Sequence, residues 1–170
     1  IDSEKVRSGR EKLDEALKQM NELRELGEIP PYNEGNTRGM LKYWGAPNHT
    51  PWNMCPVAGN PLDEEELSRL NAQAHEYVFK YLDFWRASVP GMKNAEIEQT
   101  GFALGVRESR RIKGLKTLTA EMVLNAEKCG DAVGHGVWMI DIHDPEGSGH
   151  TTFTDQKESQ KLRAGTSYHI

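Results

Sequence analysis

The segment from Asp63 to Gly91 constrains the fold most strongly, because apolar residues recur at helical spacing between a signal for a helix start and a signal for a helix end. Asp63 and Glu66 have the spacing of a helix N-terminal cap, and "VPG" at Val89 to Gly91 is typical of a helix end. Between them, apolar residues return at spacings of three and four, which predicts one buried helix face. These residues are Leu67, Leu70, Ala74, Val78, Tyr81, Leu82 and Trp85.

A second amphipathic helix is predicted from about Ser8 to Leu26. Ser8 and Glu11 form the pattern of a capping box, and Gly27 is suited to close the C-terminus. The opposite face is charged, so we expect this helix to pack on one side only. Its apolar stripe consists of Leu13, Ala16, Leu17, Met20 and Leu23.

The connection between the two helices, residues 28–61, is rich in Pro, Gly and Asn but also contains Tyr43, Trp44 and Trp52. A purely disordered linker would be poor in aromatic residues, so we expect an ordered connection. Short strands are predicted around Met40 to Trp44 and around Trp52 to Val57.

Beyond the long helix, the pattern predicts an extended stretch at about Glu96 to Val106 and a short helix that opens at Thr119 and stops at Gly130. A strand follows at Val137 to His143. The predicted fold is α+β, with a mixed or antiparallel small sheet, two long amphipathic helices and one short helix. A length of 170 residues favours one domain. Within it, residues 1–61 form the N-terminal helix and irregular connection, and residues 62–170 form the α+β region.

The formal net charge of −5 argues against general binding to nucleic acid or to membrane surfaces, because such binding depends on clustered cations. No apolar run is long enough for a membrane span. Cys55 and Cys129 are too few for a disulfide framework and have no zinc-type spacing. No dinucleotide or nucleotide cradle motif and no nucleophile elbow occurs, and the compartment stays open.

One stretch, "ALGVRESRRIKG", is nevertheless basic. If it is extended, alternation places Arg107, Ser109 and Arg111 on one face, and Glu108 with Arg110 on the other. Arginine side chains can hold a carboxylate or phosphate through two hydrogen bonds, and Glu108 could orient a neighbouring arginine. A solvated, charged strand end is the alternative.

Asp141 and His143 share one face of the strand predicted at Val137 to His143. A carboxylate beside an imidazole suits proton transfer or polarisation of a substrate, whereas a purely structural pair is the alternative. His135, His143 and His150 flank the loop "HDPEGSGH", but their spacing matches no metal motif, so no metal site is predicted.

Four stretches, "VPGMKNAEI", "LGVRESRRIKGLKTLTAEMV", "DIHDPEG" and "SYHI", together resemble the interior of a family of bacterial FAD-dependent oxidoreductases. The similarity covers roughly Trp52 to Ile170, and "GVRESRRIKG" is its most specific part. The resemblance implies that FAD binds elsewhere, through a Rossmann-type motif upstream of Ile1 and a segment beyond Ile170. Because the chain also starts without methionine, we expect a piece of a longer protein.

The resemblance further implies that the chain is the inserted substrate or cap domain, whose partners are the FAD-binding half of the same protein and a small-molecule substrate. Arg107, Glu108, Arg110 and Arg111 match the family's motif position by position, and His143 matches its "DxH" stretch, although the match does not decide which of them contact substrate. We expect the first four, together with Asp141, to bind substrate and His143 to be catalytic. Lys116 and Met122 depart from the family pattern, which often has an aromatic residue and Asp there.

Under this interpretation the full-length protein is the enzyme, and the chain alone is inactive and binds no FAD. A different hypothesis is a noncatalytic module that binds an acidic, carboxylate-bearing ligand through the arginine face. A third is a fragment that only dimerises through its amphipathic helices.

Overall fold

The computed structural model describes residues 1–34, 37, 48–107, 109–138, 140–147, 151–153 and 167–169. The chain divides into two compact units. Unit 1 comprises Ile1–Ser109 with Asp144–His150, and unit 2 comprises Arg110–His143 with Thr151–Ile170.

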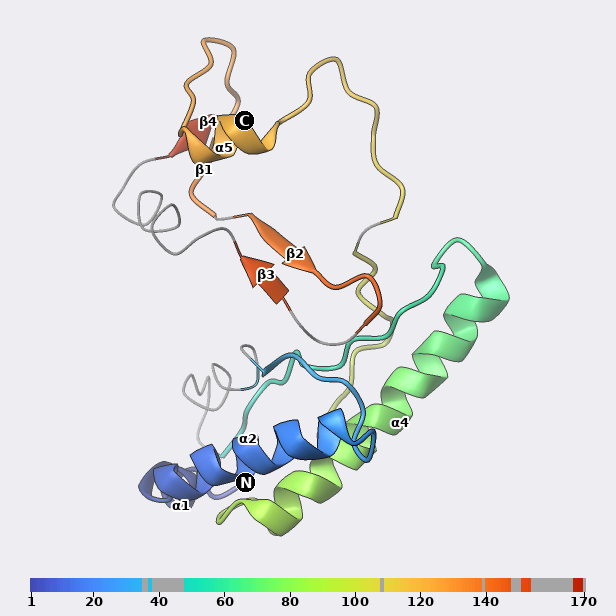
Figure 1. The fold of residues 1–170 in the computed structure, drawn as a ribbon, viewed down its shortest axis with the longest axis vertical. Helices are drawn as coiled ribbons and strands as arrows, with labels where there is room; N and C mark the ends of the chain where they lie inside the picture. Colours follow the sequence, from blue (N-terminus) through green and yellow to red (C-terminus); the bar gives the residue numbers. More distant parts are fainter. Residues whose placement is uncertain are drawn as a thin grey trace. The chain divides into compact units, whose positions relative to one another are not determined.

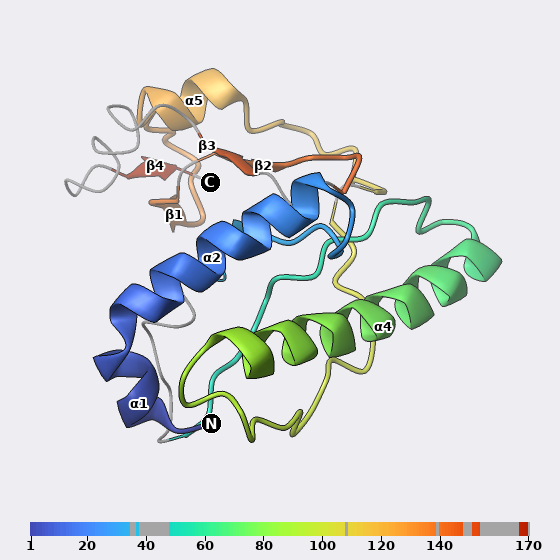
Figure 2. The same cartoon turned by 60° about the horizontal axis from the view of Figure 1, so that its bottom comes forward.

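Unit 1 is built on helices, and its two long ones confirm the two predicted amphipathic helices. The helices are α1 (Ser3–Ser8), α2 (Arg10–Glu25) and α4 (Glu64–Ser88). α2 packs against α4, and α1 continues from the N-terminal end of α2 (Figures 1 and 2). The predicted apolar stripes of these helices therefore meet in one core.

The core of unit 1 centres on Trp85 of α4, whose side chain is fully buried. Its indole contacts the rings of Trp52 and Phe84, with centroids 5.5 Å and 5.3 Å away. Around it pack buried side chains from both long helices, from the connection between them and from the segment after α4: Leu13, Leu17, Met20, Tyr32, Met54, Tyr81, Leu82 and Met92. The aromatic residue Trp52 thus belongs to the core, as expected for an ordered connection.

The ends of α4 follow the sequence signals closely. The Asp63 carboxylate accepts a hydrogen bond from the backbone N–H of Glu66 at 2.9 Å, which confirms the predicted cap. Val89 ends the helix in an extended conformation, with φ −117° and ψ 120°, because a residue before proline is disfavoured in the helical region. Of the predicted stripe, Leu67 and Val78 are only half-buried.

The start of α2 differs from the prediction, because the proposed capping box at Ser8 and Glu11 is wrong. Gly9 occupies the N-cap position and offers no side-chain hydrogen bond. The Ser8 hydroxyl instead donates to the carbonyl of Lys5 at 3.2 Å, at the end of the preceding helix α1. The chain forms a short extra helix before α2, and Ser8 serves the end of that helix.

The end of α2 confirms the role predicted for Gly27, whose φ is +73°. Its N–H donates to the carbonyl of Arg24 at 3.0 Å, and the N–H of Glu28 donates to Leu23 at 2.9 Å. This pair of bonds is the Schellman arrangement, which satisfies carbonyls that the helix leaves unpaired.

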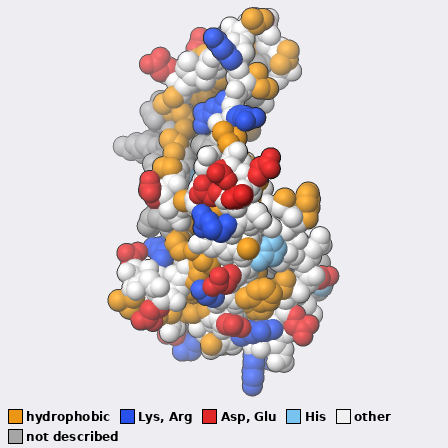
Figure 3. Space-filling model, turned by 90° about the vertical axis from the view of Figure 1, so that its right-hand side faces the viewer, with side chains coloured by type: hydrophobic (Ala, Val, Ile, Leu, Met, Phe, Trp, Pro, Cys, Tyr) orange, Lys and Arg blue, Asp and Glu red, His pale blue; other side chains and the backbone are white. Residues whose placement is uncertain are grey.

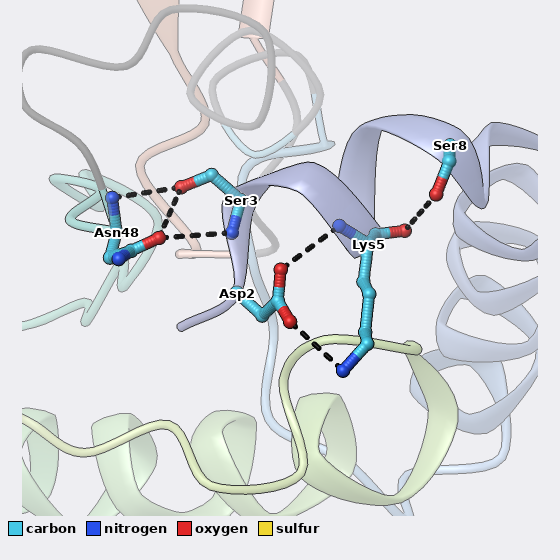
Figure 4. Close-up of polar contacts among 5 residues, drawn as sticks. All are labelled: Asp2, Ser3, Lys5, Ser8 and Asn48. Carbon is cyan, nitrogen blue, oxygen red and sulfur yellow. Dashed lines mark hydrogen bonds and ion pairs between the residues drawn. The ribbon is translucent and has the colours of Figure 1, made fainter.

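Polar contacts hold the N-terminus of α1 in place (Figure 4). Asp2 accepts a hydrogen bond from the N–H of Lys5 at 3.1 Å and pairs with the Lys5 ammonium at 3.0 Å. The backbone N–H of Asn48 donates to the Ser3 hydroxyl at 2.9 Å, and the Ser3 N–H donates to the Asn48 side-chain oxygen at 3.3 Å. Residues far apart in the sequence are thereby joined.

In the described part of unit 2, the chain forms one short helix and four short strands, which pair as two separate antiparallel pairs. The small core of the unit consists of Val123 and Tyr168, with Ala126 and Ile140 against them. The elements are α5 (Ala120–Leu124), β1 (His135–Gly136), β2 (Asp141–His143), β3 (Thr151–Phe153) and β4 (Tyr168–His169). β1 pairs with β4, with Gly136 opposite Tyr168, and β2 pairs with β3, with Asp141 opposite Phe153.

The helical part of the predicted α+β fold is confirmed, and the sheet is smaller than predicted. The residues that the structure describes form no sheet larger than two strands. The strand predicted from Val137 is confined to Asp141–His143. α5 ends at Leu124, before Gly130, because Ala126 adopts a positive φ of 51° and its N–H bonds back to Val123.

Two other extended segments do not become strands. The structure assigns neither helix nor strand to Trp52–Val57, so the strand predicted there is wrong. The stretch predicted to be extended, Glu96–Val106, also contains neither helix nor strand. The chain is ordered there without a ladder partner among the described residues. The strand predicted around Met40 to Trp44 lies outside the described residues.

Candidate functional site

The arginine segment predicted to bind substrate is exposed and irregular. Arg107, Arg110 and Arg111 are all exposed, and no helix or strand is assigned between residues 107 and 118 within the described part. Arg110 and Arg111 have no ion pair or hydrogen bond with any described residue. Glu108, predicted to orient an arginine, lies outside the described residues. Guanidinium groups that have no partner among the described residues can bind a carboxylate without first breaking an internal ion pair.

The apolar half of the same segment is also exposed. Phe102 is fully exposed and Val106 is half exposed. Further along, Ile112 and Leu115 are fully exposed as well. The strand-like alternation therefore does not describe this segment, because no neighbouring strand fixes its backbone.

The Asp141 and His143 pair forms as predicted, on strand β2. The strand directs both side chains to one face, and His143 Nε2 lies 3.3 Å from Asp141 Oδ1. Both side chains are largely shielded from solvent, with 30% of His143 and 21% of Asp141 exposed. Nε2 faces the carboxylate at ion-pair distance, and Nδ1 is the ring nitrogen that the carboxylate does not face.

The structure brings together only part of the predicted site. Asp141 and His143 are in contact, whereas Arg110 and Arg111, in the same unit, form no hydrogen bond or ion pair with either of them. Arg107 belongs to unit 1. Lys116, one of the departures from the family pattern, pairs with Asp131 at 3.3 Å. The Cys129 thiol and the Asp131 carboxylate raise the pKa of Lys116.

A second polar cluster in unit 2 was not predicted. The Lys128 ammonium donates to the carbonyl of Ser167 and to its hydroxyl, the latter at 3.0 Å. His135 Nδ1 lies 3.3 Å from the same hydroxyl. These contacts tie the start of β4 to β1 and to the chain beyond α5. Sequence alone gives no signal for them, because Ser167 lies 39 residues from Lys128.

The described helix N-termini do not fit the pyrophosphate of FAD. Such a group needs backbone N–H donors and a positive field, which acidic side chains oppose. Yet every described helix has a glutamate in its first turn: Glu4 in α1, Glu11 in α2, Glu64, Glu65 and Glu66 in α4, and Glu121 in α5. The described residues therefore do not build a dinucleotide cradle.

The described residues contain neither a candidate metal cluster nor a candidate membrane-spanning helix. No three His, Cys, Asp or Glu side chains come together there in a way that could hold a metal ion. Within the same residues, no helix combines the length and the apolar character needed to cross a membrane.

Comparison with known proteins places the chain in a family. No curated protein and no solved structure gave a significant match to it. The family model described as FAD dependent oxidoreductase matches residues 3–170, which is nearly the whole chain and includes the arginine segment and the Asp141 and His143 pair. The chain therefore belongs to the FAD-dependent oxidoreductase family.

Proposed function

We propose that the chain is the substrate-binding cap of an FAD-dependent oxidoreductase and covers a flavin held by an FAD-binding half of the same protein. The observation that carries the proposal is the pair of exposed arginines, Arg110 and Arg111, which have no partner among the described residues in a chain of net charge −5. Membership in the family supplies the cofactor, since FAD performs hydride transfer.

The arginines are proposed to hold the substrate. Arg107, Arg110 and Arg111 would bind an anionic group of the substrate, and Glu108 would orient one of the guanidinium groups. This assignment favours substrates that carry a carboxylate. Their positive charge would also be suited to stabilising negative charge that develops during the reaction.

His143 is proposed to move a proton, with Asp141 as its positioning residue. The 3.3 Å distance between Nε2 and the carboxylate supports this assignment, because a carboxylate beside an imidazole suits proton transfer and the other nitrogen, Nδ1, faces away from it. Asp141 would in addition stabilise the protonated ring.

The acidic helix N-termini support the location of the flavin outside the described residues. We expect the 170-residue chain, titrated with FAD, to leave the visible absorbance spectrum and the fluorescence of the free flavin unchanged. Stoichiometric retention of FAD through gel filtration would contradict this part of the proposal.

The arginine assignment is tested in a protein that carries this chain together with its FAD site. We expect Arg110→Gln with Arg111→Gln to raise the KM of an acidic substrate by on the order of tenfold or more, because each charged hydrogen bond contributes about 1.5–3 kcal/mol. The flavin spectrum should not change. Lys93→Gln, an exposed change in unit 1, is the matched control.

A noncatalytic module that binds acidic ligands is the second candidate, and the same free arginines favour it. The two functions separate when substrate is added anaerobically, because only the enzyme cap supports bleaching of the flavin. Binding of D-glucuronate that is lost in the arginine variant, with no flavin reduction by any bound acid, would favour the module.

A further inference from the structure

A groove of about 410 Å³ lies within unit 1, between one face of α4 and the segment that follows it. Its volume falls inside the range of about 300–1,000 Å³ that is usual for small-molecule sites. α4 contributes His75, Phe79, Leu82 and Arg86, and the wall opposite is the stretch from Glu96 to Thr100. None of these residues belongs to the arginine segment or to the Asp141 and His143 pair.

The wall of the groove is fastened to α4 at both ends. At one end, the Thr100 hydroxyl lies 3.2 Å from His75 Nε2, while His75 Nδ1 lies 2.8 Å from the carbonyl of Asn71. Since a carbonyl only accepts, Nδ1 carries the proton, and the Thr100 hydroxyl donates to Nε2. At the other end, Arg86 Nε donates to the carbonyl of Ala95 at 2.7 Å. The groove is thus formed before any ligand enters.

The floor of the groove is apolar and open. Leu82 is 7% exposed, Ile97 is half-buried, and the Phe79 side chain remains 58% exposed although its neighbours are packed. Figure 3, which faces the right-hand side of Figure 1, shows a histidine beside hydrophobic side chains on this side of the molecule. An aromatic or aliphatic group placed on the Phe79 ring would remove apolar surface from water.

The free charge at the groove is negative. The Arg86 guanidinium donates a hydrogen bond to the Ala95 carbonyl, and its Nη1 lies 3.6 Å from Asp83 Oδ1. Glu98 pairs with His49 at 2.7 Å. Glu96 is exposed and has no ion pair or hydrogen bond with a described residue. A cationic group therefore finds an available carboxylate beside an apolar floor.

We propose that this groove binds a small hydrophobic amine. The apolar group of the ligand lies on Phe79, Leu82 and Ile97, and its ammonium pairs with Glu96. The groove contains none of the proposed substrate arginines, and its test does not depend on redox activity.

The test is a titration of the 170-residue chain with 2-phenylethylamine, followed by NMR of the backbone amides. We expect the shifts to concentrate at residues 96–100 and at the groove face of α4, and to leave α5 unaffected. The neutral analogue 2-phenylethanol should bind about three- to fivefold more weakly, since exposed charge pairs contribute up to about 1 kcal/mol. Equal affinity for the amine and the alcohol, or shifts spread over the whole chain, would overturn the proposal.

Two variants separate the contribution of the Glu96 charge to ligand affinity from that of the apolar floor. Glu96→Gln should reduce affinity for the amine to that for the alcohol, and Phe79→Ala should weaken both ligands by on the order of tenfold. Glu22→Gln, an exposed change on α2, is the matched control and should leave both affinities unchanged. Because Phe79 and Glu96 are exposed, these variants should fold, which circular dichroism checks. Amine binding that survives both variants sinks the assignment to this groove.

Discussion

At the scale of single residues, Gly91 holds the end of α4 against the start of the chain. Its φ is +90°, a conformation that side chains disfavour, and its carbonyl accepts the N–H of Asp2 at 2.8 Å. A Cβ on Gly91 would lie 2.6 Å from the carbonyl oxygen of Asp2. Both the backbone angle and the close approach therefore require glycine.

Gly91→Ala should lower the free energy of unfolding by about 1–3 kcal/mol, because it adds backbone strain and a steric clash. Urea denaturation followed by circular dichroism measures this loss. Gly105→Ala is the control, since no atom lies within 4 Å of its Cβ position and its φ is not positive. Equal losses in the two variants would show that the Gly91 conformation is not what matters.

Among the described thiols, the Cys55 thiol is the one whose pKa the fold changes most clearly. Burial raises the pKa of Cys55 from 9.0 to about 11. At mildly alkaline pH, the fraction of Cys55 that is thiolate is about a hundredfold smaller in the folded than in the unfolded chain. Labelling by a thiol reagent should therefore be slower in the folded than in the urea-unfolded chain by about that factor. Cys129→Ser isolates the signal of Cys55. Equal rates in the two states would contradict the burial of this thiol.

The same pKa shift has a consequence for stability. Because the folded state keeps the proton on Cys55, the stabilisation is fully present below pH 9 and is lost as the pH rises through about 11. The Cys55→Ala variant should lose this part of the pH dependence, which denaturation curves across that window measure. An unchanged dependence would assign the alkaline loss to other groups.

At the scale of elements, one of the two helix-capping patterns in the sequence caps its helix in the structure and the other does not. Asp63 caps α4, whereas Ser8 serves the end of α1 and leaves α2 without a side-chain cap. Both patterns are the same in sequence, an oxygen-bearing side chain followed three residues later by glutamate. The two sites differ because a short helix, α1, precedes α2 and ends at Ser8.

Asp63→Ala should therefore lower the free energy of unfolding by about 1 kcal/mol, the usual effect of losing an N-cap. Ser8→Ala should cost less than about half of that, because Ser8 caps no helix N-terminus. Paired denaturation curves give both values. A loss at Ser8 as large as that at Asp63 would restore the predicted capping box.

The strands show where sequence pattern stops being informative. Alternation placed Asp141 and His143 on one face, and their 3.3 Å contact confirms it. The same alternation extended the strand back to Val137, whereas β2 begins at Asp141 and, among the described residues, pairs with β3 at Thr151–Phe153. Strand length depends on the partner, which lies outside the local pattern.

At the scale of the whole molecule, the chain passes from unit 1 to unit 2 between Ser109 and Arg110 and returns between His143 and Asp144. The arginine segment spans the first crossing, and the Asp141 and His143 pair immediately precedes the second. The boundary expected between residues 61 and 62 stays a prediction.

Limited proteolysis tests the exposure of the first crossing. Among trypsin sites in the described residues, we expect those at Arg107, Arg110, Arg111 and Lys113 to be cut first, because they are exposed and lie outside helices and strands. Mass spectrometry of a time course identifies the order. Earliest cuts within α4 would contradict it, and added acidic substrate should slow cleavage at the arginines if they bind it.

The sequence by itself determined the two long helices, the Asp63 cap, the Gly27 stop, the shared face of Asp141 and His143, and the family to which the chain belongs. All of these depend on residues close together in the chain, or on a motif read in order. Only the tertiary structure decided the two strand pairs, the absence of partners for Arg110 and Arg111 among the described residues, and the groove fastened by His75 and Thr100. Each of these depends on which distant residues meet, and packing of the whole chain sets those contacts.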